Sequence, residues 1–135
     1  MTVSPEKIST DEFNPLMQTI AEGWNDGNAP RAANCFSEDA IYLEPPDKQL
    51  YRGRAELYEF FGGDNGTDIP MIMTWQHLAL NEEDQIGFGE YTFEMHRRYH
   101  GSVVVKIELG VVKCWREYQY QTGLTWEEFT SQNPF

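Results

Sequence analysis

The sequence is poor in the residues on which several functional classes depend. It contains 2 cysteines, 3 histidines and 10 basic residues, against 22 acidic ones. The resulting formal charge of −12 repels phosphate backbones and anionic membranes, which argues against partners of either kind. The histidines and cysteines lack metal-ligand spacing, and no glycine-rich phosphate loop follows a strand. The sequence therefore predicts neither a metal site nor a cofactor.

Long apolar runs are also lacking. No segment approaches the length of a membrane span, and the N-terminal MTVSPEKIST has neither the basic nor the apolar part of a signal peptide. The isolated cysteines, Cys35 and Cys114, are typical of a reducing compartment, where a buried thiol behaves as a small apolar group. We therefore expect a cytoplasmic protein with free thiols, and a disulfide is the less favoured alternative.

Aromatic side chains are abundant, at 14% of 135 residues. They carry much buried area per residue, which helps a short chain to build a core. The length fits one domain. We expect residues 1–9 to form a flexible N-terminal arm and residues 10–135 to form the folded domain.

Three helices are expected in the first half of the chain. The first starts at the capping-box spacing of Ser9 and Glu12 or, alternatively, at Asn14-Pro15. A short second helix begins near Pro30, and the third covers residues 54–61.

After residue 70 the periodicity becomes that of strands. Several runs rich in β-branched and aromatic residues follow one another: MIMTWQHLAL, IGFGEYTFEMHRR, SVVVKIEL and VVKCWREYQY. Turns are expected at NEED, at YHG and at Leu109-Gly110, and a short strand over residues 39–44 precedes a loop. This order predicts an α+β fold, with one strongly curved antiparallel or mixed sheet and the helices on one face.

This organisation resembles the nuclear transport factor 2-like superfamily and, within it, the SnoaL-like family. Three stretches carry the resemblance: the helix ending in GWNDGN, the segment FSEDAIYLEPPDKQLYRGRAELYEFF and the strand GVVKCWREYQY. The resemblance implies a cone-shaped half-barrel with three N-terminal helices packed on its concave side. It leaves the function open, because the superfamily includes isomerases, cyclases, epoxide hydrolases, dehydratases and non-catalytic binders.

The resemblance also implies two candidate catalytic acids. Glu44, in LEPP, is similar to the general base of ketosteroid isomerases, and the prolines after it would stiffen the strand end. Glu117, in the run WREY, is similar to the pocket acid of limonene epoxide hydrolases and SnoaL-type cyclases. The accompanying residues differ: Ile20 replaces the oxyanion-hole tyrosine, and Val103 the cyclase histidine.

Strand alternation predicts an aromatic cavity around these acids. The other residues expected to contact a ligand are Trp24, Tyr42, Trp75, His77, Tyr91, Phe93 and Trp115. Each has a structural alternative, since the tryptophans and the histidine also suit a core, and the glutamates suit ion pairs.

Three functions follow from these patterns. The first is a cofactor-independent isomerase, cyclase or hydrolase, with Glu44 as base and Glu117 as second acid or orienting group, acting on a small, largely apolar molecule. The second is a ligand-binding domain without chemistry. The third is a dimeric interaction module. A homodimer is expected under all three, because the outer face of a curled sheet needs cover.

Overall fold

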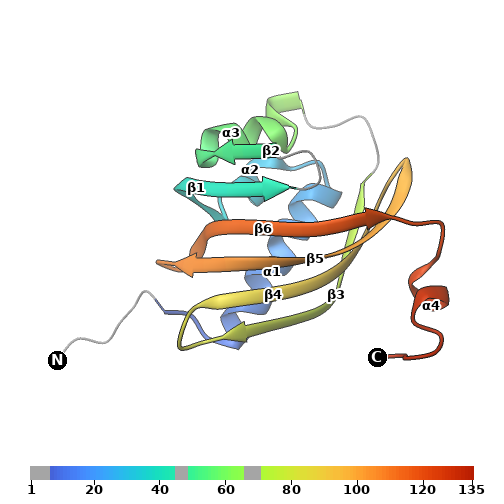
Figure 1. The fold of residues 1–135 in the computed structure, drawn as a ribbon. Coiled ribbons are helices and arrows are strands. Elements are labelled where there is room, and N and C mark those ends of the chain that lie inside the picture. The colour runs from blue at the N-terminus through green and yellow to red at the C-terminus, as the bar shows by residue number, and fades with distance from the viewer. Residues whose placement is uncertain (1–6, 45–48, 66–70) are drawn as a thin grey trace.

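A layer of helices packs against one curved sheet. The computed structural model describes residues 7–44, 49–65 and 71–135. Helix α1 (Thr10–Asn25) crosses one face of the sheet, and α2 (Ala29–Ala33) and α3 (Gly53–Phe60) extend the helical layer (Figure 1). A 3₁₀ turn, η1 (Gly63–Asn65), follows α3, and a last short helix, α4 (Trp126–Phe129), lies beyond the end of the final strand.

The first of the two expected start signals begins α1. Ser9 is the N-cap, and its backbone N–H donates to Glu12 Oε1 at 3.1 Å. This bond satisfies a donor that the first turn of a helix leaves free. The inward face of α1 then buries Phe13, Met17 and Ile20 completely, as the helical spacing predicts.

The sheet is six-stranded, mixed and open, with the order β2-β1-β6-β5-β4-β3. The pair β1–β6 is parallel, and the other neighbouring pairs are antiparallel. The α+β prediction is therefore confirmed. The strands are β1 (Phe36–Glu44), β2 (Gln49–Arg52), β3 (Ile72–Asn81), β4 (Ile86–Met95), β5 (Arg97–Glu108) and β6 (Val111–Gln121).

Two local predictions are wrong. The segment that forms β2 was expected to be loop, but it pairs with the end of β1. The turn expected at YHG lies inside β5, and the chain reverses instead at His96, whose φ is 66°. Gly101, the glycine of YHG, does not form a turn; it is needed because a side chain at this position would clash with Tyr91. The turn at Leu109-Gly110 is confirmed, with φ values of 55° and 80°.

The described end of the expected arm, residues 7–9, is bound to the β3–β4 turn. The backbone N–H of Ile8 donates to Gln85 Oε1 at 2.9 Å, and Gln85 Nε2 donates to the carbonyl of Ile8 at 3.0 Å. Both cysteines carry free thiols. Within the described ranges, no helix is long and apolar enough to cross a membrane.

The C-terminal segment covers part of the outer face of the sheet, opposite α1. His100 of β5 is only 2% exposed, because its ring packs against Trp126 and Phe129 at centroid distances of 5.6 and 5.2 Å. Further on, Phe135 lies 5.2 Å from the ring of His77 on β3. The segment after β6 therefore runs back across β5 to β3, which leaves the inner face of the sheet to the helices.

Candidate functional site

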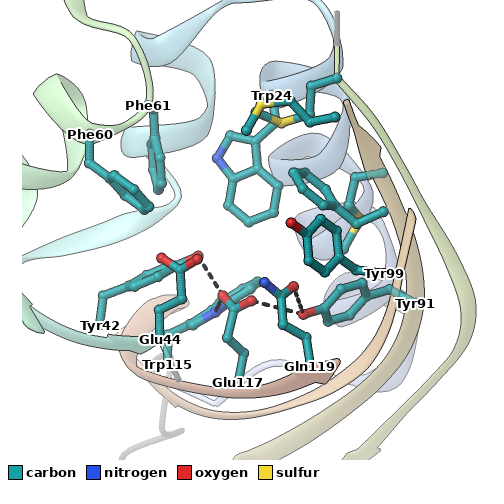
Figure 2. Close-up of a pocket in the computed structure, with 14 residues that line it drawn as sticks. Trp24, Tyr42, Glu44, Phe60, Phe61, Tyr91, Tyr99, Trp115, Glu117 and Gln119 are labelled. Atoms are coloured by element: carbon teal, nitrogen blue, oxygen red, sulfur yellow. Dashed lines mark hydrogen bonds between the residues drawn. The ribbon is translucent and has the colours of Figure 1, made fainter. Parts of the chain in front are cut away.

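A cavity of about 370 Å³ lies between the helices and the inner face of the sheet. This volume is within the range of small-molecule sites. Figure 2 shows its side chains converging on one space. The lining residues are Trp24, Tyr42, Glu44, Phe60, Phe61, Met71, Met73, Tyr91, Phe93, Met95, Tyr99, Trp115, Glu117 and Gln119.

The helical wall of the cavity is fixed by contacts at the end of α1. Asn25 Oδ1 accepts a hydrogen bond from the backbone N–H of Met73 at 2.7 Å, and Asn25 Nδ2 donates to the backbone carbonyl of Met73 at 3.0 Å. These bonds tie α1 to β3 directly beside Trp24. The indole of Trp24 then meets Phe61 edge to face, with ring centroids 5.3 Å apart. Trp24 is thus held between the sheet and the end of α3.

The sheet wall is built by the parallel pairing of β1 with β6. Tyr42 is the register partner of Trp115, and their rings stack with centroids 5.3 Å apart and planes 6° apart. Glu44 follows Tyr42 by two residues, so it points to the same face, where it is half-buried. Pro45 and Pro46, expected to stiffen this strand end, lie outside the described residues.

Glu117 is a buried carboxylate held by three donors. It is 7% exposed. Its Oε1 accepts from Tyr42 Oη at 2.7 Å and from Trp115 Nε1 at 2.8 Å, and its Oε2 accepts from Tyr91 Oη at 2.8 Å. Figure 2 shows these groups gathered at one side of the cavity. Both carboxylate oxygens are therefore engaged, and the side chain has one position.

The three bonds account for a buried acid that forms no ion pair with the described residues. A hydrogen bond to a charged group contributes about 1.5–3 kcal/mol, and burying a carboxylate costs several kcal/mol after relaxation. Three such bonds therefore offset a cost of that size. Burial, and then the charge of Glu117, raise the pKa of both Tyr42 and Tyr91 well above the usual value for tyrosine. The two phenols thus stay protonated, as donors must.

Tyr91 connects Glu117 to a further polar group. Its Oη also lies 2.8 Å from Gln119 Oε1. A phenol has one hydroxyl proton to donate, and Tyr91 donates it in the hydrogen bond to Glu117. Turning the Gln119 amide over would place an N–H donor against the Tyr91 oxygen, which satisfies both groups.

Most of the residues predicted for the site do line the cavity. They are Trp24, Tyr42, Glu44, Tyr91, Phe93, Trp115 and Glu117. The alternation assigned to β4 and β6 from the sequence is therefore correct, and it brings together two acids distant along the chain.

Two predicted ligand contacts lie elsewhere. Trp75 packs in the core below α1, where its Nε1 donates to the carbonyl of Met17 at 2.8 Å. His77 was expected on the face of Trp75, but the register slips by one residue between them. This bulge turns His77 outward, where Nδ1 lies 3.0 Å from Glu90 Oε1.

Sequence reasoning did not assign Phe60, Phe61 and Tyr99 to the cavity. The two phenylalanines end α3, and nothing in the local pattern says which side the helix end faces. Tyr99 was placed in a turn, but it is the register partner of Phe93 on β4. A correct β4–β5 register would have revealed it, because directly opposed residues share a face.

The lining is negative and has no basic group among the described residues: it holds two carboxylates and no lysine, arginine or histidine. No cluster of three possible metal ligands is found in the described parts of the chain. The arrangement suits a small molecule bound among aromatic rings, with proton transfer or charge recognition at the carboxylates.

No protein-family model and no curated protein matches the sequence. Solved structures do match. An NTF-2 like protein of unknown function from Burkholderia xenovorans LB400 is 14% identical, with 93% of this chain and 94% of that chain covered and a TM-score of 0.71. The epoxide hydrolase/cyclase-like enzyme SalBIII, which takes part in pyran ring formation in the polyether salinomycin, is 17% identical, with 82% and 92% covered and a TM-score of 0.69.

An LEH-like epoxide hydrolase from M. tuberculosis is 13% identical, with 82% of this chain and 84% of that chain covered and a TM-score of 0.69. Identities at this level carry the fold and leave the activity open. Together with the mixed sheet and the helices on its inner face, they show that the chain has the nuclear transport factor 2-like fold.

Proposed function

We propose that the cavity binds a small, largely apolar molecule and that Glu44 transfers a proton to or from it, in a cofactor-independent isomerase, cyclase or hydrolase reaction. The observation that carries this proposal is the meeting of Glu44 from β1 and Glu117 from β6 in one aromatic cavity. The fold shared with SalBIII and with the M. tuberculosis epoxide hydrolase supports it.

The two acids have different roles in this proposal. A general base needs a lone pair within reach of a substrate proton. Hydrogen bonds from Tyr42, Tyr91 and Trp115 hold Glu117 in place and occupy three of its about four lone-pair sites, so we assign it the role of a fixed negative charge that orients the ligand. Glu44, half-buried at the end of β1, is the proton-transferring group.

The test uses small cyclic ketones and epoxides as probes. Exchange of the protons next to the carbonyl is followed by NMR in deuterated water, and epoxide opening by chromatography. We expect Glu44→Gln to slow the reaction about 100-fold or more, the usual contribution of a general base. Glu108, an exposed acid on β5, provides the control Glu108→Gln, which keeps the wild-type rate. Equal rates for Glu44→Gln and wild type would refute the role of Glu44.

A second candidate function is binding without chemistry. One observation favours it: Glu117 is held in place by three donors, as in a recognition site built around a fixed charge. A molecule that co-purifies with the protein and is recovered chemically unchanged after long incubation would support this function over the first.

The homodimer, the cytoplasmic location and the division into an arm and one domain remain predictions. Light scattering at micromolar concentration tests the first. The outer face available for pairing is narrower than the sequence suggests, because the segment after β6 already covers His100 and contacts His77.

A further inference from the structure

We propose that the molecule bound in the cavity carries a positively charged nitrogen, as in a tertiary or quaternary amine, placed between Glu117 and the aromatic walls. This inference rests on the proposed function only in requiring that the cavity binds a small molecule. It does not require proton transfer by Glu44.

The charge around Glu117 favours a cationic ligand. Its three partners, Tyr42, Tyr91 and Trp115, are neutral donors, so they supply hydrogen bonds but no positive charge. None of the ion pairs formed within the described ranges includes Glu117. Because the carboxylate is shielded from water, its field acts strongly on the neighbouring cavity. A ligand cation would supply the charge that this part of the protein does not.

The geometry of the aromatic rings also favours a cation. Trp24 stands nearly perpendicular to Trp115, at 80° with centroids 5.6 Å apart, and at 68° to Phe61. Rings set at such angles form a corner with walls in different planes, as Figure 2 shows for Trp24 and Phe61. The face of an aromatic ring carries negative potential and attracts cations, above all quaternary ammonium groups and above all at tryptophan.

The rest of the lining suits an alkylated amine. Three methionines, Met71, Met73 and Met95, provide soft apolar contacts that suit N-methyl or N-alkyl groups. The remaining polar groups, on Tyr99 and Gln119, are neutral. An anionic ligand would meet two carboxylates with no basic group among the described lining residues. A neutral ligand would gain from burial but make no use of the charge.

The test compares two molecules of the same shape. Benzyltrimethylammonium and neopentylbenzene differ in one atom, a charged nitrogen in place of a carbon. Binding of each is measured by quenching of tryptophan fluorescence, since Trp24 and Trp115 line the cavity. We expect the cation to bind at least about tenfold more tightly than the hydrocarbon. Phenylacetate, an anion of similar size, should bind least.

Variants then locate the effect. Glu117→Gln removes the charge but can still accept from Tyr42 and Trp115 and donate to Tyr91, so the cavity is retained. It should lower the preference for the cation at least about fivefold. Glu108→Gln removes the same charge outside the cavity, and it should leave the preference within about twofold. This control separates the local charge from the attraction of a chain with net charge −12.

Several results would overturn the inference. If neopentylbenzene binds as tightly as benzyltrimethylammonium, the site recognises neutral molecules, and the proposed function survives without this refinement. Tighter binding of phenylacetate than of benzyltrimethylammonium would show that the cavity prefers anions to cations. An equal loss of preference in both glutamine variants would make the effect a property of the whole chain. If none of the probes changes the fluorescence, the cavity does not admit small molecules, and the proposed function fails with it.

Discussion

Tyr91 lies across Gly101, its register partner on β5, and the position that a Cβ atom on Gly101 would occupy is 2.7 Å from the Tyr91 hydroxyl. Gly101 is in turn the register partner of Gln119 on β6. Because Gly101 has no side chain, the phenol of Tyr91 can pass over β5 and reach Glu117 and Gln119 on β6. A glycine that reads as a turn residue in the sequence is therefore a condition for the hydrogen-bonded site.

Replacing Gly101 by alanine should disrupt the site. The new methyl group would clash with the ring and hydroxyl of Tyr91 and with the carbonyl of Tyr118 at 2.7 Å. We expect a loss of about 1–3 kcal/mol in the free energy of unfolding, the usual cost of overpacking, measured by urea denaturation. Gly123→Ala is the matched control, because no atom lies within 4 Å of its added Cβ. Equal stability of the two variants would contradict the spatial role of Gly101.

The acceptor at residue 117 should matter for stability beyond its charge. Glu117→Leu leaves the hydroxyl of Tyr42 and the indole N–H of Trp115 without their acceptor, whereas the hydroxyl of Tyr91 can still donate to Gln119 Oε1. Each buried donor without a partner costs about 1–3 kcal/mol. We expect Glu117→Leu to lose more than about 2 kcal/mol in the free energy of unfolding, and Glu117→Gln less. The exposed control Glu108→Leu should change it by less than about 0.5 kcal/mol.

His100 should make the fold sensitive to acid. Burial, and then the charge of Arg98, lower the pKa of His100 below its ordinary value of 6.5, with Glu90 acting in the opposite direction. Neither ring nitrogen has a hydrogen-bond partner within the described ranges. Below pH 6.5 the unfolded chain therefore binds a proton that the folded chain does not, so stability is complete above that pH and falls as the pH drops toward the lowered pKa.

This prediction is checked by urea denaturation between about pH 7.5 and about pH 5. His100→Phe should lose less stability over this range than wild type, since it cannot be protonated. His96→Phe, at an exposed turn position, should keep the wild-type slope. If the slopes of all three proteins coincide, His100 does not contribute to the pH dependence.

The outward position of His77 predicts a contrast with Trp24. Trp24→Ala should weaken binding of benzyltrimethylammonium about tenfold, because it removes one wall of the cavity. His77→Ala should leave the affinity unchanged. Its contact with Glu90 is exposed on both sides, so its loss should cost at most about 1 kcal/mol. Weaker cation binding in His77→Ala would show that the bulge does not decide which residues reach the ligand.

The sequence predicts most of this site because the relevant strands keep strict alternation. Tyr91, Phe93 and Trp115 fall on the inner face as period-two counting requires. The failures occur where one residue is inserted or a register is unknown. The bulge between Trp75 and His77 reverses every later assignment on β3, and no residue in that stretch marks it. Tyr99 was missed because the reversal at His96 relies on a non-glycine residue with positive φ.

The hydrogen-bond partners of Glu117 are harder to predict from the sequence than the residues that line the cavity. Three side chains on β1, β4 and β6 converge on one carboxylate, and Tyr42 stands 75 residues before it. Composition and spacing indicate that a glutamate lies on an aromatic face. They do not indicate that its partners are hydroxyl and indole donors rather than an arginine, because this depends on the sheet order β1-β6-β5-β4.

The insertion of β6 between β1 and β5 has a consequence for biosynthesis. Polypeptides leave the ribosome N-terminus first, so the strand that carries Trp115, Glu117 and Gln119 is the last of the sheet to emerge. Until then, β1 and β5 each present an unpaired edge, the kind of surface on which nascent chains associate. The pocket therefore cannot be complete before β6 has emerged, because this strand supplies the carboxylate and pairs with both edges.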